Sequence, residues 1–417
     1  MPAELRIGPN QHGTRPRSFW RLNTSETVIL AWVPAALIWG LSIFNFSSSN
    51  DASLGAPSGR DFVRLYVLGR VVADRHGDAL YDLEAFNAIK LALFPALTAD
   101  PYPQPYPPHV GLYFAPMARL PYPHALVSWI VGSVLLFGAA SWWAARLTGL
   151  PGAQSAALLG LALAFPPLVE VKSFGQATAI PLASFVLGWR FLLNDRSVLA
   201  GAAFGLLAVK PQLAVPLGVV AIAQGRWRMV AGAALSVAAQ AAVTWWWLGP
   251  SVFVHYLSYV RQFPTFVDSF QRDLTQTHSL RSLFALLVPA GPASAAYFAT
   301  AGIVLWQTVR ACRAARDVGL AMSVLIMASV LVSPHLYIYD AAVMLPALVY
   351  LLASGWGSTE SSARKTVVGA LLLYPAYFLP VARYTRVQVS VIVLLWVFWT
   401  VCSEIASDDD GDARAEG

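Results

Sequence analysis

The chain has 417 residues, of which 57% are hydrophobic and only 12% are charged, and its net charge is +6. Soluble globular proteins carry about 25% charged residues, so this composition excludes an ordinary soluble enzyme and predicts a membrane protein. No run of Lys and Arg is dense enough to follow a phosphate backbone, so nucleic acid is not an expected partner. Two cysteines, Cys312 and Cys402, are too few for a disulfide framework and are interpreted as inert thiols.

Apolar segments recur along the whole chain, each near the length of about 20 residues that a membrane-spanning helix needs. We expect spans at residues 27–46, 122–145, 153–169, 174–193, 197–209, 211–224, 229–248, 293–310, 318–333, 337–354, 365–380 and 387–404. The sequence therefore predicts an all-α polytopic membrane protein with about 12 transmembrane helices. The first segment lacks a convincing cleavage site, so we expect it to remain as a span rather than a signal peptide.

The distribution of basic residues predicts the orientation. If the tail at residues 1–26 lies in the cytoplasm, every second connection carries Arg or Lys, as cytoplasmic loops do. The membrane domain then covers residues 27–404, and its two long connections, 47–121 and 249–292, lie outside. The acidic tail at residues 405–417 returns to the cytoplasm. We expect a multi-pass protein of the inner (plasma) membrane whose long loops face the periplasm or the outside.

The first long loop begins with a charged segment, GRDFVRLYVLGRVVADRHGDALYD at residues 59–82. Its spacing predicts an amphipathic helix at the membrane surface, with Arg64 and Arg70 in solvent. The opposite, apolar side would hold Phe62, Leu65, Tyr66, Leu68 and Val72. Asp61 falls in the first turn of this helix, where a carboxylate can satisfy free N–H groups and the helix dipole. Asp61 is therefore either a helix cap, a functional carboxylate, or both.

Unusual polar residues gather on the side predicted to be outside. They are Asp61, Glu170, Lys172, Lys210, His278, Arg281, His335, Asp340 and Arg383. Charged groups at the ends of apolar spans are costly, and they usually line a cavity or pair with one another. Lys210 and His335 also adjoin prolines, in VKPQ and SPHLYIYD, which break helices and leave backbone groups that need water or protein partners. These positions predict one wet cavity that opens outward.

Structural explanations of the same residues stay open. Lys210 could extend its ammonium group to the lipid headgroups, and His335 could be a hydrogen-bonded structural histidine. His335 and Asp340 are five residues apart, about 140° around a helix, so they are not expected to form a contiguous pair.

Several motifs occur in an order that resembles a known family. They are RDFVRLYVLGRVVADRHGDALYD, YPPHVGLYFAPMARLPY, KSFGQATAIPLAS, AGAAFGLLAVKPQLAVP, QTHSLRSLF and SPHLYIYDAAVMLPA, between about residues 60 and 346. This set resembles the membrane mannosyltransferases that use polyprenyl-phosphate sugars, of the phosphatidylinositol-mannoside mannosyltransferase type with a GT-C fold. The resemblance implies a GT-C glycosyltransferase fold with amphipathic helices in its external loops.

The resemblance also implies roles for individual residues. Asp61 matches the aspartate that serves such enzymes as catalytic base in the first external loop. Lys210 and His335 match basic groups that hold the lipid phosphate. Possible further substrate contacts are Lys172, Gln176, His278, Arg281 and Arg383.

The implied chemistry is an inverting transfer. The acceptor hydroxyl needs a base to remove its proton as it attacks the sugar. Charge that grows on the departing phosphate needs fixed cations. The expected partners are a polyprenyl-phosphate sugar donor, a lipid or glycan acceptor and membrane lipids. We expect no metal ion and no cofactor.

Two other classes of protein fit the same composition. A transporter or flippase would have many spans, but it would place charges on both sides of a central site. A non-catalytic membrane subunit that binds lipid or an assembly partner would need no base. Within the enzyme class, mannose is the expected sugar, although arabinofuranose fits the same motifs.

Overall fold

The computed structural model describes residues 24–48, 59–100, 104–270, 273–315, 317–354, 366, 370 and 381–415. Most of the expected N-terminal tail and nearly all of the expected span at 365–380 lie outside the described residues. Within the described part of the chain the regular structure is helical, and the only strand-like pairing is an isolated antiparallel bridge between Thr277 and Tyr337. The prediction of an all-α protein is confirmed.

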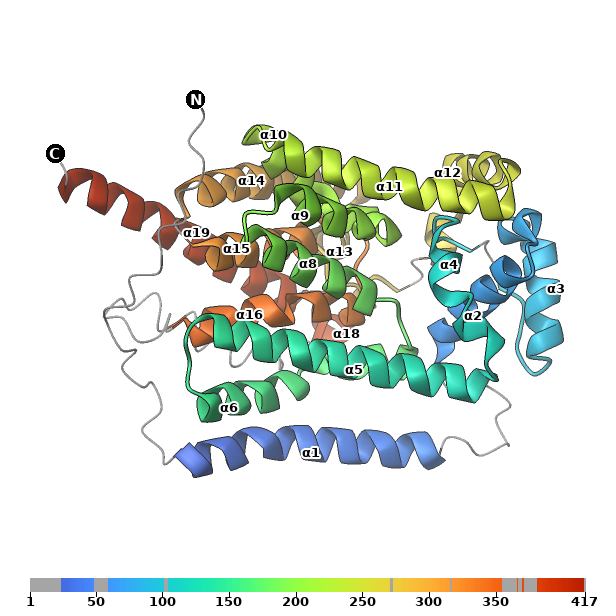
Figure 1. The fold of residues 1–417 in the computed structure, drawn as a ribbon, viewed down its shortest axis with the longest axis horizontal. Helices are drawn as coiled ribbons and strands as arrows, with labels where there is room; N and C mark the ends of the chain where they lie inside the picture. Colours follow the sequence, from blue (N-terminus) through green and yellow to red (C-terminus); the bar gives the residue numbers. More distant parts are fainter. Residues whose placement is uncertain are drawn as a thin grey trace.

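The long helices run roughly parallel to one another (Figure 1). They are α1 (Thr24–Ser48), α5 (Tyr122–Leu147), α11 (Trp227–Leu248), α14 (Ala290–Ala314) and α19 (Val389–Ala415). Three helical segments in the described chain are long and apolar enough to cross a membrane, namely Tyr122–Leu147, Trp227–Leu248 and Val389–Ala406. A fourth span is possible if α6 (Gly152–Leu163) and α7 (Pro166–Phe174), bent by 53°, count as one. The chain is therefore an apolar, helical membrane protein, and the number of twelve spans stays a prediction.

Prolines explain why several expected spans are short or broken. The segments α9 (Ser197–Phe204) and η4 (Gly205–Val209) end at Lys210, and η5 (Pro211–Ala214) and α10 (Val215–Ala223) follow. Pro211 lacks an N–H group and cannot continue the preceding helix. The same happens after α15 (Val318–Val332), where Pro334 precedes η7 (Ile338–Met344) and α16 (Leu345–Ala353). Both breaks bring polar residues to one end of the helical bundle.

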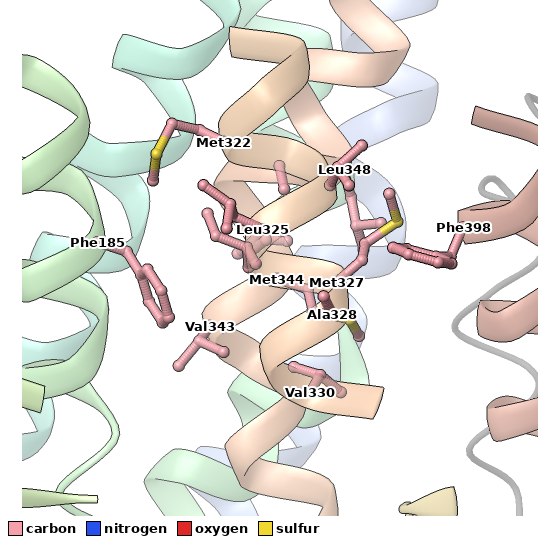
Figure 2. Packing of buried hydrophobic residues seen from close by; sticks show 14 of the residues in the cluster. Phe185, Met322, Leu325, Met327, Ala328, Val330, Val343, Met344, Leu348 and Phe398 are labelled. Carbon is pink, nitrogen blue, oxygen red and sulfur yellow. The ribbon is translucent and has the colours of Figure 1, made fainter. Parts of the chain in front are cut away.

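A central helix, α15, organises the main core. Nearly all of its side chains are buried, and they pack on α14, α16 and α19 and on α8 (Ala179–Leu192). Figure 2 shows this packing: Met322, Leu325 and Val330 of α15 lie between Phe185 of α8 and Phe398 of α19. Such close packing is typical of protein interiors, and it fixes the end of α15 from which the next loop starts.

A second core forms at the end of the bundle that lies to the right in Figure 1. It contains α2 (Arg60–Ala73), η2 (Gly77–Leu80), α3 (Leu83–Leu93), α4 (Val110–Phe114), η3 (Met117–Arg119) and α12 (Ser251–Phe270). The prediction that residues 59–82 contain a helix is confirmed.

The predicted exposure of α2 is partly wrong. Val63, Val67 and Val71 are buried, as well as the apolar side predicted from the sequence. Arg70 is exposed as predicted and pairs with Asp74 at 2.8 Å. Arg64 is instead mostly buried and pairs with Asp100 at 3.1 Å. Surrounding elements cover α2 on nearly every side, so less of its surface is exposed than the sequence predicted.

The helix with an exposed apolar side in this region is α12. Val254, Leu257 and Val260 are exposed, whereas Val252 and Tyr259 are buried. The second long loop, at residues 249–292, therefore contains an amphipathic helix with an exposed apolar side. In the first long loop, α2 was expected to have such a side, but it is covered.

Candidate active site

A cavity of about 990 Å³ lies where the two helix breaks meet the start of α2. Its walls come from α2, α7, the η4–η5 break, the loop between α15 and η7, α13 (Leu280–Leu287) and α18 (Val381–Thr385). Most of the residues predicted from the sequence line it: Asp61, Gln176, Lys210, His278, Arg281, His335 and Arg383. Lys172 is not in its wall. The cavity predicted from the scattered polar residues is therefore present.

Asp61 is held at the start of α2 by unusual backbone geometry. Gly59 precedes the helix with φ of 77°, and a Cβ atom there would lie 2.7 Å from Leu126. Gly59 occupies the cap position, and no side chain caps this helix. Asp61 is therefore not the N-cap residue, although it lies in the first turn as predicted, where a carboxylate suits the helix dipole. Its carboxylate instead accepts hydrogen bonds from the amide of Gln176 and from the side chain of Tyr339.

The surroundings of Asp61 favour a carboxylate that can take up a proton. Burial raises the pKa of Asp61, because desolvation disfavours the charged form. The hydrogen bonds from Gln176 and Tyr339 and the charges of Arg64 and Lys210 act in the opposite direction. A raised pKa makes the ionised carboxylate a stronger base, which is a common feature of catalytic groups.

Gln176 reaches Asp61 because the chain turns sharply after α7. Gly175 ends this helix with φ of 67°, and a Cβ atom there would lie 2.6 Å from the Cβ of Phe62. Only glycine tolerates both the left-handed conformation and this close approach. The amide oxygen of Gln176 accepts a hydrogen bond from the Tyr106 hydroxyl at 3.0 Å.

Lys210 forms a buried ion pair with Asp340 across the cavity wall. Its ammonium group also lies 5.5 Å from the ring centre of Tyr339. The other carboxylate oxygen of Asp340 accepts the backbone N–H of Tyr337 at 3.3 Å. The hypothesis that Lys210 extends to the lipid headgroups is wrong, because the side chain is buried and paired.

His335 lies in the loop after α15, with its ring edge-on to Tyr337. Burial, followed by the charges of Lys210 and Arg281, lowers the pKa of His335 to about 3. The imidazole is therefore neutral near pH 7, whereas the sequence interpretation treated it as a basic group. A neutral imidazole still carries one N–H donor that can bind an anion.

The remaining predicted residues border the cavity on its far side. The backbone N–H of His278 donates to the carbonyl oxygen of Leu336 at 2.7 Å, and its Nδ1 lies 2.7 Å from the Ser390 hydroxyl. Burial lowers the pKa of His278 to about 4. Ser279 caps α13 and so fixes Arg281 in its first turn. Arg383 lies on α18, and its charge helps to lower the pKa of Asp273, after the hydrogen bond from Thr275.

Sequence reasoning missed two tyrosines that contact the central groups. Tyr106 lies in a proline-rich loop without any periodic pattern, so nothing in the sequence marked it. Tyr339 directly precedes Asp340 in SPHLYIYD, and its ring was overlooked beside the charged residue. Among the described residues, no three His, Cys, Asp or Glu side chains gather to hold a metal ion. Whether the protein needs a metal stays a prediction.

The fold and this cavity define an α-helical membrane protein in which a buried carboxylate faces several cations. Residues 105–334 match the model of glycosyltransferase family 87. This region covers more than half of the 417 residues, and the chain belongs to glycosyltransferase family 87. No curated protein and no solved structure gives a significant match. The matched region contains Gln176, Lys210 and Arg281, while Asp61 and His335 flank it.

Proposed function

We propose that this protein is an inverting glycosyltransferase that moves a sugar, mannose in our proposal, from a polyprenyl-phosphate donor to a lipid-linked or glycan acceptor. The observation that carries this proposal is the buried carboxylate of Asp61 in the same cavity as Lys210, Arg281 and His335. A transfer from a lipid phosphate needs one base and several donors for the leaving group, and this cavity offers both.

Asp61 acts as the general base in this proposal. An acceptor hydroxyl attacks the anomeric carbon while its proton passes to the carboxylate of Asp61. The bond between the anomeric carbon and the phosphate oxygen breaks on the opposite side, so the configuration inverts. The products are the glycosylated acceptor and a polyprenyl phosphate, which keeps the electron pair of the broken bond.

Lys210, Arg281 and His335 bind the donor phosphate. Lys210 and Arg281 both lie close enough to lower the pKa of His335, which supports a common position for the three groups. Two cations and one neutral N–H donor suit a phosphate whose negative charge increases as the bond breaks. Because these three side chains can supply hydrogen-bond donors to the phosphate, the proposal includes no divalent metal.

The lipid chain of the donor leaves the cavity along α14. Tyr297 and Phe298 of this helix line the cavity, and the side chain of Phe298 is 71% exposed on the outer surface. This apolar wall next to Arg281 suits a molecule with a charged phosphate and a hydrocarbon chain. The arginine distribution supports a position of the site on the outer face of the inner (plasma) membrane.

Transfer assays with purified protein test the proposal. We would supply a lipid extract of the host with radiolabelled polyprenyl-phosphate sugars or with radiolabelled nucleotide sugars, each in turn, and compare the wild-type protein with Asp61→Asn. We expect labelled product from one polyprenyl-phosphate sugar and none from nucleotide sugars. Transfer only from a nucleotide sugar would contradict the donor class, and wild-type rates with Asp61→Asn would contradict the role of the base.

A further inference from the structure

Gln176 connects Asp61 to Tyr106, whose hydroxyl is hydrogen-bonded to the amide of Gln176 and not to the carboxylate of Asp61. The Nε2 group of Gln176 donates to Oδ2 of Asp61, and its Oε1 accepts from the Tyr106 hydroxyl at 3.0 Å. Gln176 is 5% exposed. Both ends of its amide are thus engaged inside the protein, which leaves little of it for direct binding of a substrate.

The orientation of this amide follows from its neighbours. The backbone N–H of Ala177, which can only donate, points to Oε1 of Gln176 at 3.3 Å. The Tyr106 hydroxyl donates to the same oxygen, and burial raises the pKa of Tyr106, so that its proton is retained. Because the N–H of Ala177 cannot accept a hydrogen bond, it fixes the oxygen of the amide on this side, and the NH₂ group then faces Asp61. Reversed, the amide would place an oxygen against the carboxylate, which would disfavour its ionised form.

Tyr106 is itself fixed by a set of buried contacts. The side chain of Gln104, fully buried, accepts from the backbone N–H of Tyr106 at 2.6 Å and donates to its carbonyl oxygen at 2.7 Å. The Tyr81 hydroxyl donates to the same carbonyl oxygen at 2.7 Å. On the other side, the indole N–H of Trp129 donates to the carbonyl oxygen of Gln176 at 3.0 Å. These contacts hold both residues of the pair through groups other than the hydrogen bond between them.

We propose that Tyr106 and Gln176 form a positioning pair, in which Tyr106 orients the amide of Gln176 and this amide fixes and keeps ionised the carboxylate of Asp61. This inference rests on the proposed role of Asp61 as base. It assigns Gln176 to the base rather than to the substrate, and it gives Tyr106 a function that no sequence motif indicated.

Other groups also act on Asp61, and the test must leave them in place. The charged and titratable groups that face it or its tyrosine neighbours are Arg64 on α2, Lys210 at the helix break, Tyr337 directly before η7, and Tyr339 and Asp340 on η7. The hydroxyl removed in Tyr106→Phe and the amide removed in Gln176→Leu are hydrogen-bonded to each other, to Asp61 and to the backbone of Ala177, and not to these groups. A change in the acid titration of these variants therefore reports the loss of the amide contact.

The experiment measures kcat/KM for transfer from polyprenyl-phosphate mannose as a function of pH, with purified protein and host lipid extract. Transfer requires ionised Asp61, so the rate falls on the acid side of its pKa. Removal of a donor from the ionised form raises that pKa. In Gln176→Leu we expect the acid limb of the pH profile, where the rate falls as Asp61 takes up a proton, to move to higher pH by about one to two units. Tyr106→Phe should move it in the same direction by less, and Gln176→Glu, which puts a second carboxylate beside Asp61, should also move it upward.

A second tyrosine–glutamine pair elsewhere in the protein provides the control. The Tyr113 hydroxyl donates to Oε1 of Gln240 at 2.9 Å, and neither residue lines the cavity. Tyr113→Phe loses an equivalent hydrogen bond and should keep the wild-type pH profile. An unshifted acid limb in Gln176→Leu and Gln176→Glu, with thermal stability like that of the control, would overturn the positioning pair. In that case Asp61→Asn shows which hypothesis is wrong. If Asp61→Asn is inactive, Asp61 can still be the base and only the role of the Tyr106–Gln176 pair is refuted. If Asp61→Asn is active, the role of Asp61 as base is refuted as well.

Discussion

The buried ion pair of Lys210 and Asp340 allows the structural and the catalytic roles of Lys210 to be separated. The side chains are 9% and 7% exposed, so replacement of one partner leaves a charge in the interior. Loss of one member of a buried pair typically costs about 3–5 kcal/mol, mainly because the other charge stays unpaired. We expect Lys210→Met and Asp340→Leu each to lower the thermal unfolding temperature of the purified protein by several degrees.

The double variant Lys210→Met/Asp340→Leu should behave differently. Replacement of a buried ion pair by apolar side chains of similar volume is often neutral or stabilising. We therefore expect the double variant to unfold near the wild-type temperature. If Lys210 binds the donor phosphate, this stable protein should still lose about tenfold to a hundredfold in transfer, since hydrogen bonds to charged groups are worth about 1.5–3 kcal/mol.

The assay pairs fluorescence-monitored thermal unfolding with transfer at limiting donor. The exposed pair of Arg70 and Asp74, with side chains 45% and 42% exposed, gives the matched control. Surface pairs of this spacing contribute about 0.3–0.5 kcal/mol, so Arg70→Met should change neither measurement appreciably. Wild-type transfer by the double variant would refute the binding of phosphate by Lys210. Unfolding of the double variant at the lower temperature of the single variants would refute the argument from an unpaired buried charge.

Further predictions concern the base, the histidines and the orientation. Asp61→Asn should cost about 10²–10⁴ in rate without loss of folded protein, whereas the same change at Asp74 or Asp78 should leave transfer nearly unchanged. The pKa of His335 is lowered to about 3 and that of His278 to about 4, so each stays neutral in the folded state and takes up a proton more readily when unfolded. Stability should therefore decrease as the pH falls below the usual histidine pKa of about 6.5, and less so in His335→Gln, as measured by unfolding temperature across this range. Cysteines introduced at Ser58 and Gln271 should react with an impermeant thiol reagent in intact cells and one at Thr359 should not; reaction at Thr359 would overturn the orientation. The native Cys312 and Cys402 are buried and should not contribute to this labelling.

The sequence predicted the location of the site better than its internal contacts. Lys210 and His335 stood out because charged or polar groups next to prolines are rare in an apolar chain, and Asp61 stood out because it opens a helix directly after the first span. All three line the cavity. The pairing of Lys210 with Asp340 could not be predicted, because 130 residues separate them and only the packing around α15 brings the two helix breaks together. Tyr106 gave no signal, since its loop has no periodicity.

The error on α2 has a different physical origin. A hydrophobic pattern tells which sides of a helix are apolar, but it does not tell what will cover them. In α2 the side with Val63, Val67 and Val71 was assigned no partner, yet all three are buried within the second core, to which α4 and α12 contribute. Arg64 could then be buried as well, because Asp100 lies within 3.1 Å of its guanidinium group.

Charge balance in the cavity places a constraint on how a phosphate can bind. The lining acids are Asp61, Glu170, Asp273 and Asp340, and the lining bases are Arg64, Lys210, Arg281 and Arg383, so the two signs are equal in number. Both lining histidines have strongly lowered pKa values and add no charge near pH 7. A phosphate therefore cannot be attracted by an excess of positive charge. It has to compete locally with carboxylates such as Asp340, and binding would make Lys210 exchange one anion for another. Such an exchange keeps Lys210 paired but leaves the buried carboxylate of Asp340 without its cation, so the gain from binding the donor phosphate has to exceed that cost.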